Sequence, residues 1–478
     1  MSVAHAETLL ARSLADTTEA EARQRTRLAA VVEDERLRAL TFALTDEVLR
    51  VDDNWRAAGR FRAIVRDIGV PPSLSLFDRW SLRVGAVVAP AVPWVVMPLV
   101  RRRVLKESNG VVLPADDPDF ARHMAARRAA GFPLNVNVLG EAILSDDEAD
   151  ERMRLIRERV ARPDVDYISL KISAVVANLD VLAFDHSVDA ICERLRVLHR
   201  DAAAAAPTVF VNLDMEEYRD LPLTIASLMR VLSEPEFEAV HAGIVLQAYL
   251  PDSHAACEQL CTWAAQRHQR AGGTLKVRVV KGANLAMEKV EAELHGWQQA
   301  PYLTKAEVDA SFKKLVTAVL DPRWVGAVRL GFASQNLFDL AWAAELAAVN
   351  PGRIDIEMLE GMAPAQARAV REEVGEVLLY APVVRHDDLP ASIAYLSRRL
   401  DENTAPDNFL RALFTLRPGT PEWADQAARF TRAVEEAATV STQPRRVQDR
   451  CQQAGDQRRH RDHLGRHRVE GQHPQPEG

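Results

Sequence analysis

Leu275-Lys-Val-Arg-Val-Val-Lys-Gly-Ala-Asn284 is the stretch around which the rest of the chain is organised. Aliphatic residues alternate with Lys276 and Arg278, a pattern that predicts a short buried strand. The strand ends at Lys281, and Gly282 then allows a ligand to approach the backbone because it has no Cβ. A buried arginine requires an anionic or electron-rich partner, since an unpaired buried charge is costly. A strand whose basic residues face solvent is the alternative, and this stretch alone does not decide between the two.

Short apolar runs of this kind recur along the chain and alternate with long amphipathic segments. Eight runs are found: Leu134–Val138, Tyr167–Ile172, Thr208–Asp214, Gly243–Leu250, Leu275–Val280, Ala327–Phe332, Arg353–Met358 and Val377–Tyr380. The helix-like segments between them include Asp146–Val160, Val188–Ala204, Glu216–Leu232, Ala256–Ala271 and Lys305–Leu320. Ser145-Asp-Asp-Glu148 is expected to open the first of these as a capping box. Eight strands separated by helices predict an α/β protein, a (β/α)8 barrel of the TIM type.

Polar residues recur where these runs end. They are Lys171, Asp214, Gln247, Arg278, Ser334 and Tyr380. Because a (β/α)8 barrel carries its chemistry at the C-terminal ends of its strands, these residues are expected to lie together at an active site. Asp214 has a second interpretation, as the cap of a helix that begins at Glu216. Both can hold, but a carboxylate buried without partners is costly, and the strand-end position favours function.

Composition describes an ordinary globular protein of 478 residues with 47% hydrophobic and 27% charged residues. The formal net charge of −8 argues against wholesale nucleic-acid binding. Four cysteines are too few for a disulfide framework, and Cys257-x-x-x-Cys261 lacks a second pair of ligands, so no metal site is expected. A reducing cytoplasmic compartment fits this cysteine usage, and the N-terminus lacks a basic and apolar signal peptide.

The N-terminal region, residues 1–66, is expected to be helical because it is rich in Ala, Glu and Arg. Leu37, Leu40, Leu44 and Val48 recur at three- and four-residue steps, which predicts one apolar face packed on the main domain or on a partner. The region carries no helix-turn-helix or ribbon signature of a DNA-binding protein.

The most hydrophobic stretch is Val84–Val100, which contains Pro90, Pro93 and Pro98 and is followed by Arg101-Arg-Arg103. A transmembrane helix needs about 20 uninterrupted apolar residues, and prolines destabilise a helix interior. We therefore expect broken helices that pack against the barrel, with contact to an anionic lipid surface as the alternative.

Arg278-Val-Val-Lys281-Gly-Ala resembles the core motif of the proline dehydrogenase family, flavoenzymes that oxidise L-proline. Further motifs match in family order: Leu139-Gly-Glu-Ala142, Ser169-Leu-Lys171-Ile-Ser173, Asn212-Leu-Asp214-Met-Glu-Glu217, Gln247-Ala-Tyr249-Leu, Ala333-Ser-Gln-Asn336, Leu359-Glu-Gly-Met362, Tyr380-Ala-Pro-Val383 and Ala394-Tyr-Leu-Ser-Arg-Arg-Leu-Asp-Glu-Asn403. Each motif is weak alone, but nine in order are specific. The resemblance runs over roughly residues 120–440 and is closest to the proline dehydrogenase part of bifunctional enzymes.

The resemblance implies a catalytic role for Asp214 and Arg278 beside an FAD cofactor. We expect Asp214 to position the basic groups opposite it, and the Arg278 guanidinium to stabilise negative charge that develops on the flavin ring. The implied FAD-binding residues are Met215, Gln247, Arg278, Lys281, Gly282, Ala283, Ser334 and Gln335. No Gly-x-Gly-x-x-Gly motif occurs, so a Rossmann dinucleotide site is not expected.

The substrate site implied by the family is formed by Lys171, Leu359, Tyr380, Tyr395, Arg398 and Arg399. Leu389–Asn403 is interpreted as the final barrel helix, on which Tyr395 lies three and four positions before the arginine pair. Adjacent guanidinium groups suit a carboxylate, with Lys171 as the third cation. A solvated helix face with ordinary ion pairs is the alternative, and the motif Tyr-x-x-Arg-Arg-x-x-Glu favours the substrate site.

Two positions depart from the family pattern. Gln335 stands where histidine is common, and Asn284 where many members have tyrosine. Gln335 can still donate and accept hydrogen bonds, whereas Asn284 removes an aromatic wall near the flavin. These departures bear on FAD affinity and substrate geometry.

The resulting hypothesis is an FAD-dependent proline dehydrogenase. Hydride would pass from C5 of L-proline to flavin N5, giving Δ1-pyrroline-5-carboxylate, the first step of proline degradation to glutamate, with a membrane quinone as electron acceptor. The expected location is cytoplasmic, with peripheral contact at the inner face of the cell membrane and scope for a homo-oligomer. Alternatives are a flavin barrel enzyme for another small amino acid or amine, and an inactive barrel used as a binding module.

The expected domains are a helical N-terminal region (1–125), the barrel (126–440) and a disordered basic tail (441–478). Thr439-Val-Ser-Thr-Gln-Pro-Arg-Arg446 resembles the linker that leads to the aldehyde dehydrogenase of bifunctional relatives. The residues after it have too few large aliphatic side chains to offset the entropy of ordering. The tail permits weak polyanion contact but no specific nucleic-acid recognition. We therefore expect only the first half of proline catabolism, and the abrupt composition is also that of a truncated or frame-shifted longer gene.

Overall fold

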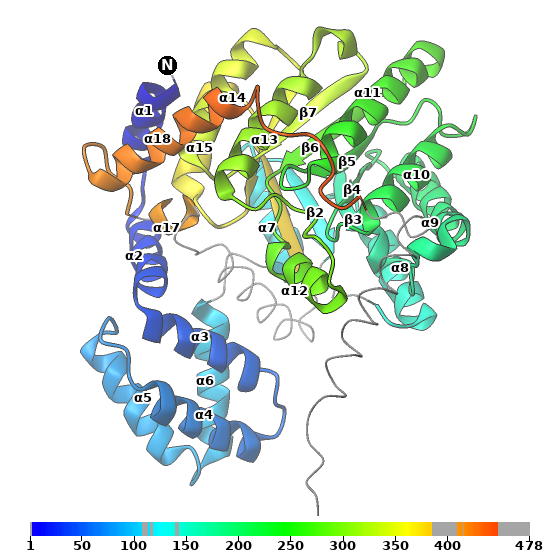
Figure 1. The fold of residues 1–478 in the computed structure, drawn as a ribbon. Coiled ribbons are helices and arrows are strands. Elements are labelled where there is room, and N and C mark those ends of the chain that lie inside the picture. Colours follow the sequence, from blue (N-terminus) through cyan, green and yellow to red (C-terminus); the bar gives the residue numbers. More distant parts are fainter. Residues whose placement is uncertain are drawn as a thin grey trace, which may run out of the picture.

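Eight parallel strands form a closed barrel in the computed structural model, which describes residues 2–107, 113–114, 118–138, 143–384, 409–413 and 415–447 (Figure 1). The strands are β2 (Leu134–Val138), β3 (Tyr167–Lys171), β4 (Phe210–Asp214), β5 (Ala242–Gln247), β6 (Leu275–Val280), β7 (Val328–Ala333), β8 (Ile354–Leu359) and β9 (Leu378–Val384). The ring closes because β9 pairs with β8 on one side and with β2 on the other. A two-residue strand, β1 (Leu113–Pro114), pairs with Val383 and Val384 at the C-terminal end of β9. The (β/α)8 prediction is confirmed.

Helices cover the outside of the barrel (Figure 1). In chain order they are α7 (Asp119–Ala129), α8 (Asp146–Val160), α9 (Phe184–Ala204), α10 (Asp220–Leu232), α11 (Asp252–Ala271), α13 (Lys305–Val319), α14 (Leu337–Val349), α15 (Pro364–Val374), α17 (Phe409–Leu413) and α18 (Pro421–Glu436). Helix α12 (Leu285–His295) follows β6 and lies below the strands in Figure 1. The expected capping box of α8 is only half formed. Ser145 Oγ accepts from Glu148 N at 3.2 Å, but the Glu148 carboxylate accepts from Leu144 N, one residue before the cap.

The inside of the barrel is polar, whereas the layer between strands and helices is aliphatic. Buried polar residues on the strands include Asn135, Asn137, Ser169, Asn212, Lys276, Arg278 and Glu357. Two glycines make room for them. A Cβ on Gly331 would lie 2.7 Å from Glu357 Oε1 and 2.9 Å from Lys276 Cε, and a Cβ on Gly243 would lie 2.4 Å from Asn212 Oδ1. All three distances are too short for real atoms, so glycine at these two positions is what allows large polar side chains to share the interior.

The N-terminal region is helical, as predicted, but it is broken by caps into α1 (Ser2–Ala15), α2 (Glu19–Glu33), α3 (Glu35–Glu47) and α4 (Asn54–Ile68). Thr18, Asp34 and Asp53 each accept a backbone N–H at the start of a helix. Helix α1 lies against α14 and α15 of the barrel, and its Leu9 and Leu10 join the barrel core.

Helices α3 and α4 form a separate small bundle with α5 (Leu76–Val88) and α6 (Pro93–Glu107), beside the barrel in Figure 1. Leu40, Leu44 and Val48 are buried there against Phe61 and Met97. The predicted apolar face is therefore confirmed. Its partner is not the main domain but the other helices of this bundle.

The stretch Val84–Val100 forms broken helices, as predicted, because the chain turns between Val88 and Pro93. The expectation that it packs against the barrel was wrong. Its buried residues Ala86, Ala89 and Met97 face the bundle core, while Val87 and Trp94 are exposed. In the part of the chain that the structure describes, no helix has the length and apolar character needed to cross a bilayer.

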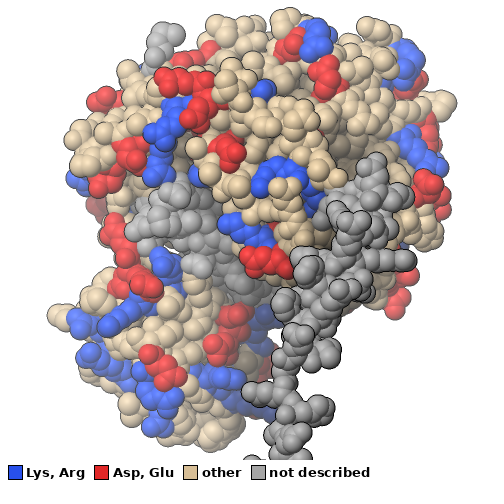
Figure 2. All heavy atoms as spheres, viewed as in Figure 1, with Lys and Arg blue, Asp and Glu red and all other residues tan. Residues whose placement is uncertain are grey.

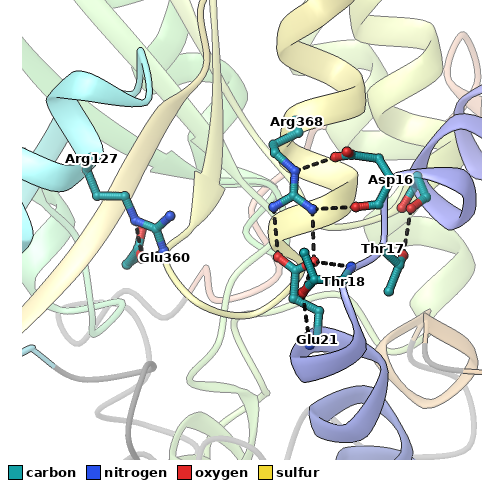
Figure 3. A network of polar contacts seen from close by, with 8 residues as sticks. Asp16, Thr17, Thr18, Glu21, Arg127, Glu360 and Arg368 are labelled. Atoms are coloured by element: carbon teal, nitrogen blue, oxygen red, sulfur yellow. Dashed lines mark hydrogen bonds and ion pairs between the residues drawn. The ribbon is translucent and has the colours of Figure 1, made fainter.

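A charged network fastens the α1–α2 junction to the barrel (Figure 3). Arg368 of α15 donates to Glu21 Oε1 at 2.7 Å and to the Asp16 carbonyl at 2.9 Å, and it also binds the Asp16 carboxylate. Glu21 completes a capping box with Thr18, whose backbone N–H and hydroxyl both donate to it at 2.9 Å. The hydrogen bond from Arg368 lowers the pKa of Glu21 to about 2, against the effect of burial.

The C-terminal part of the described chain packs onto the barrel. Helix α18 lies against α13. The predicted disordered tail starts too early at residue 441, because residues 441–447 make contacts: Arg446 Nε donates to Gln298 O at 3.3 Å and its guanidinium lies 4.7 Å from the Trp297 ring. Residues 448–478 lie outside the described chain.

Candidate functional site

Asp214 lies at the C-terminal end of β4, inside the mouth of the barrel, and is 7% exposed. Its Oδ2 accepts from Tyr380 Oη at 2.7 Å and Asn137 Nδ2 at 2.9 Å, and its Oδ1 accepts from Asn212 Nδ2 at 2.9 Å. Arg278 Nη1 lies 3.3 Å from Oδ1. Burial raises the pKa of Asp214, while Arg278 and the Tyr380 hydrogen bond oppose that rise.

Asp214 does not cap a helix, which corrects one of the two interpretations drawn from the sequence. Helix α10 begins at Asp220 rather than at Glu216. Side chains from other elements hold the backbone in between. Gln247 Nε2 donates to Met215 O at 3.4 Å and to Glu216 O at 3.1 Å, and Glu288 Oε1 accepts from Tyr218 N at 2.7 Å. These contacts satisfy backbone groups that would otherwise pair within a helix.

Arg278 is buried on β6 between two carboxylates. Its Nε lies 2.7 Å from Glu357 Oε2 and its Nη1 lies 3.3 Å from Asp214 Oδ1. Its guanidinium carbon is 4.5 Å from the centroid of the Tyr380 ring. Burial alone would lower the pKa of Arg278, but Glu357 and Asp214 outweigh it and raise the pKa further. The predicted burial of this cation with anionic partners is confirmed, and the solvent-facing alternative is wrong.

Lys281 is held by acidic residues of two helices. Its Nζ lies 2.6 Å from Asp309 Oδ1 and 2.9 Å from Asp339 Oδ2. Lys313 binds the other oxygen of Asp339. The pKa of Lys281 is raised because two carboxylates outweigh its burial, whereas burial lowers the pKa of Lys313, which has one, to about 8.

Gly282 has φ +110°, and a Cβ there would lie 2.5 Å from the Tyr249 ring. The sequence interpretation was that Gly282 brings its backbone close to a ligand. In the structure the close neighbour is Tyr249, whose ring occupies the space that a side chain would fill. Ala283, next along the chain, is exposed.

Ser334 and Gln335 follow β7 directly. Ser334 Oγ accepts from Asn336 N at 3.0 Å and donates to Asp339 Oδ2 at 3.3 Å, so this loop is tied to the carboxylate that binds Lys281. Gln335 Nε2 donates to Leu359 O at 3.4 Å. Gln335 therefore links the ends of two neighbouring strands.

Lys171 lies at the end of β3, as predicted, and Leu359 is the last residue of β8. The Lys171 ammonium pairs with Glu216 at 2.5 Å, a partner that the sequence interpretation did not include. Asn284 is 4% exposed and precedes α12, so the residue that departs from the family pattern is buried.

Tyr395, Arg398 and Arg399 lie outside the described residues, as do Leu139–Ala142 and the segment Leu389–Asn403. Their assignment to the substrate site and to the family motifs stays a prediction. The structure places at or just after the C-terminal ends of strands the residues Lys171, Asp214, Met215, Gln247, Lys281, Ser334, Gln335 and Leu359. Arg278 and Tyr380 lie inside β6 and β9, since β9 continues to Val384 beyond the expected run, and both side chains reach Asp214.

Several participants were missed in the sequence. Glu357 and Asn137 were not singled out, although both face the barrel interior by the two-residue periodicity of their strands. Glu357 lies opposite Leu378 and Ala333 in the neighbouring strands. Asp309 and Asp339 carried no visible signal, because an acidic residue on an amphipathic helix is usually exposed.

The described residues fit a flavin on two grounds. Gln247 Oε1 and Gln335 Oε1 are buried acceptors without a hydrogen-bond partner, and both an isoalloxazine ring and a ribityl chain offer N–H or O–H donors. The Arg278 guanidinium is a buried cation at the same mouth, and its hydrogen bond from Nη1 to Asp214 leaves donor capacity for an electron-rich ring. FAD would thus be held by Gln247, Arg278 and Gln335, with Lys281 near them at the end of β6.

No group of three or more His, Cys, Asp or Glu side chains suited to a metal ion occurs within the described ranges. Two hollows lie away from the mouth. One, lined by Glu21, Gln366 and Phe409 among others, separates α2 from the barrel. The other, of ≈ 630 Å³, lies at the N-terminal end of the strands, where Tyr167 and Lys276 line it.

Comparisons with known proteins agree with this geometry. A family model described as proline dehydrogenase matches residues 120–412. The Bifunctional protein PutA of Rhizobium meliloti is 30% identical over 213 residues, which are 42% of this chain and 16% of that protein.

Among solved structures, Proline Utilization A (PutA) from Corynebacterium freiburgense is 42% identical with a TM-score of 0.65, covering 78% of this chain and 36% of that one. PutA from Bdellovibrio bacteriovorus inactivated by N-propargylglycine is 24% identical with a TM-score of 0.70, covering 94% and 45%, and shows the shared fold. The chain spans less than half the length of each of these relatives.

Proposed function

Because this chain belongs to the proline dehydrogenase family, we propose that it oxidises L-proline to Δ1-pyrroline-5-carboxylate, with FAD as cofactor and a membrane quinone as electron acceptor. The observation that carries the proposal is the contact group at the C-terminal mouth of the barrel, in which buried Asp214 and Arg278 both meet the half-buried Tyr380. Barrel enzymes place their reacting groups at this end. When bound, FAD supplies the two-electron acceptor that no amino-acid side chain provides.

Asp214 acts as a positioning group in this proposal. Its two carboxylate oxygens bind Tyr380 on one side and Arg278 on the other, so one buried acid fixes the orientation of both. A guanidinium fixed in this way stabilises negative charge in a bound ring without reorganising during the reaction. The direction of its pKa shift agrees with a carboxylate withdrawn from water.

The substrate carboxylate is assigned to Lys171, Arg398 and Arg399, and the pyrrolidine ring to a wall formed by Leu359, Tyr380 and Tyr395. Guanidinium groups bind carboxylates in bidentate fashion, which fixes both the position and the orientation of a small amino acid. Lys171 already pairs with Glu216. A bound carboxylate would therefore share this ammonium or displace Glu216 from it.

The α3–α6 bundle offers a surface suited to an anionic membrane that carries the quinone. Phe77, Trp80, Val84 and Val87 recur at three- and four-residue steps along α5, and all are exposed, from 38% for Val84 to 74% for Val87. We call these four residues the apolar stripe. Trp55 and Trp94, 60% and 58% exposed, add an edge-to-face pair on the same bundle.

The net charge of the α3–α6 bundle is opposite in sign to that of the whole chain. Residues 35–107 contain 13 Lys and Arg against 8 Asp and Glu, a net charge of +5, whereas the whole chain carries −8. Figure 2 shows basic side chains spread over this bundle. Exposed tryptophans combined with arginines are typical of the boundary between water and lipid headgroups. We therefore assign the apolar stripe to anionic lipid, which would bring the flavin site to its acceptor.

Turnover of proline with an artificial electron acceptor tests the proposed function. We expect L-proline to reduce the dye, with Δ1-pyrroline-5-carboxylate trapped as the product. Pyrrolidine, which lacks the carboxylate, should react at least about tenfold more slowly. A comparable rate with pyrrolidine would favour an amine oxidase, and no turnover of any cyclic or linear amino acid would favour the inactive barrel.

A further inference from the structure

A chain of alternating charges runs through the barrel interior behind Arg278. Arg278 Nε lies 2.7 Å from Glu357 Oε2, and Glu357 Oε1 lies 2.6 Å from Lys276 Nζ. Lys276 Nζ in turn lies 3.0 Å from Asp355 Oδ2. The side chain of Glu357 is 0% exposed and that of Lys276 is 4% exposed. The cation at the mouth is thus the outer member of a buried network rather than one half of a single pair.

Space for this network is provided by a specific residue. Gly331 on β7 faces Glu357 and Lys276, and a Cβ there would lie 2.7 Å from the glutamate oxygen. Burial alone would lower the pKa of Lys276, but Glu357 and its other neighbours raise it, so this lysine stays charged. A charged group in the buried interior acts on other charges over several ångströms, because little water screens it.

The net charge of these buried groups determines the potential that Arg278 presents at the mouth of the barrel. Arg278 alone would face two carboxylates, Asp214 and Glu357, and the three groups together would carry a net charge of −1. Lys276 brings the sum of these four groups to zero, and Asp355, which Lys276 also contacts, has its own cation in Arg329. Without this lysine, the positive potential that Arg278 presents to a neighbouring ring would be outweighed by the acids behind it.

We propose that Glu357 and Lys276 form a positioning pair for the flavin site. Glu357 holds Arg278 through the ion pair at Nε, and Lys276 offsets the charge of Glu357, so that a bound flavin is exposed to the positive potential of the guanidinium. This inference rests on the proposed function only in requiring that FAD binds. It does not require that proline is the substrate.

Variants of the two residues should act in opposite directions. Glu357→Gln removes a negative charge near Arg278, so the flavin midpoint potential and its affinity for sulfite, an anion that adds to electron-poor flavins, should both rise. Lys276→Met removes a positive charge, so both should fall. The change in the sulfite dissociation constant should be about tenfold in each direction, as for one charge in a partly screened interior. The double variant Lys276→Met/Glu357→Gln should return close to the wild-type value.

Arg267→Met is the matched control. Arg267 is also a fully buried cation, but it binds the carbonyls of Leu232 and Phe237 in the helical shell, at 2.9 and 3.0 Å. Its loss should lower thermal stability while leaving the flavin potential and sulfite affinity unchanged. This control separates an electrostatic effect from a general weakening of the fold.

The measurement is titration of the FAD-loaded proteins with sulfite at pH 8, together with spectroelectrochemical determination of the midpoint potential. Opposite shifts in the single variants and a near-neutral double variant support the proposal. Shifts of the same sign, or no shift beyond that of Arg267→Met, overturn it. Neither readout uses proline, and dye reduction by the wild-type protein with L-proline tests the proposed function separately.

Discussion

Tyr380 donates its phenolic hydrogen to Oδ2 of Asp214 at 2.7 Å, joining β9 to β4 across the mouth of the barrel. The ring of the same tyrosine lies beneath the guanidinium of Arg278, 4.5 Å from the guanidinium carbon. One side chain thus contacts both groups assigned to catalysis. Its aromatic face also remains the candidate wall of the substrate site.

Tyr380→Phe should keep the stacking on Arg278 but remove the hydrogen bond to Asp214. A hydrogen bond to a charged group contributes about 1.5–3 kcal/mol, so proline kcat/KM should fall by about tenfold or more. Flavin content should not change. Tyr302→Phe, which loses a hydrogen bond to Ser441 O, is the matched control and should retain wild-type kinetics. Equal kinetics in the two variants would remove Tyr380 from the site.

Arg398→Ala and Arg399→Ala test the substrate carboxylate site. Each should remove a charge-assisted pair, which raises the KM for proline by roughly tenfold or more while flavin content stays constant. Arg432→Ala on α18, where the side chain is exposed, serves as the control. Unaltered proline kinetics in both of the first two variants would exclude the carboxylate role.

Arg278→Met should destabilise the protein as well as alter its flavin. The substitution leaves Asp214 and Glu357 without the cation between them, and breaking a buried ion pair costs about 3–5 kcal/mol. FAD retention and the flavin midpoint potential should also fall. Glu357 keeps its ion pair with Lys276 at 2.6 Å, so one negative charge in the group is left uncompensated. Adding Glu357→Gln removes this excess charge and should restore part of the stability. Urea unfolding of the single and double variants measures this, and no recovery in the double variant would contradict the pairing.

The lowered pKa of Glu21 predicts that part of the protein's folding stability is lost in acid. Its pKa is lowered from 4.5 to about 2 in the folded protein, chiefly by the hydrogen bond from Arg368. A carboxyl group whose pKa is lower in the folded than in the unfolded protein stabilises the fold at pH values above its unfolded pKa. This contribution is lost as the pH falls from 4.5 toward 2. Because the pair is partly solvated, the contribution should be only about 1 kcal/mol.

Glu21→Gln should therefore lower stability at pH 7 and flatten its dependence on pH in the acid range. Glu19→Gln, on the same helix turn with its side chain 93% exposed, is the control. Urea unfolding between pH 3 and pH 7 provides the measurement. A slope in Glu21→Gln equal to that of the wild-type protein would exclude this role for the network in Figure 3.

Flotation with anionic liposomes tests the apolar stripe. We expect the wild-type protein to float with anionic but not with neutral vesicles, and binding to weaken as salt rises. Trp80→Ser with Val87→Ser should abolish flotation, whereas Leu294→Ser, an equally exposed substitution on α12, should not. Self-association of the wild-type protein that the same pair of substitutions removes, without flotation, would instead assign the stripe to a protein partner.

The barrel was predictable because its strands repeat a simple physical pattern. The bounds of Leu134–Val138, Leu275–Val280 and Asp146–Val160 agree with the structure residue for residue. Short apolar runs separated by amphipathic segments leave few alternatives to this fold. The helix start at Asp220 was not predictable, because Gln247 and Glu288, both distant in sequence, hold the backbone before it.

The candidate site was predicted only in part for a related reason. Strand-end residues such as Asp214 and Arg278 could be found from the pattern of the runs, but their partners could not. Glu357 reaches Arg278 across β7, where Gly331 leaves space for its side chain, and Asp309 reaches Lys281 from a separate helix. The packing of Val84–Val100 was misjudged because an apolar stretch does not reveal which core buries it.

The visible spectrum of the purified protein under anaerobic conditions tests the central claim most directly. The account predicts a yellow protein with a bound flavin, whose absorption near 450 nm (approximately the position of any oxidised flavin) bleaches when L-proline is added. Asp214→Ala should stay yellow but bleach far more slowly. A colourless protein that added FAD does not restore, or a yellow protein that L-proline leaves unchanged, would contradict the account.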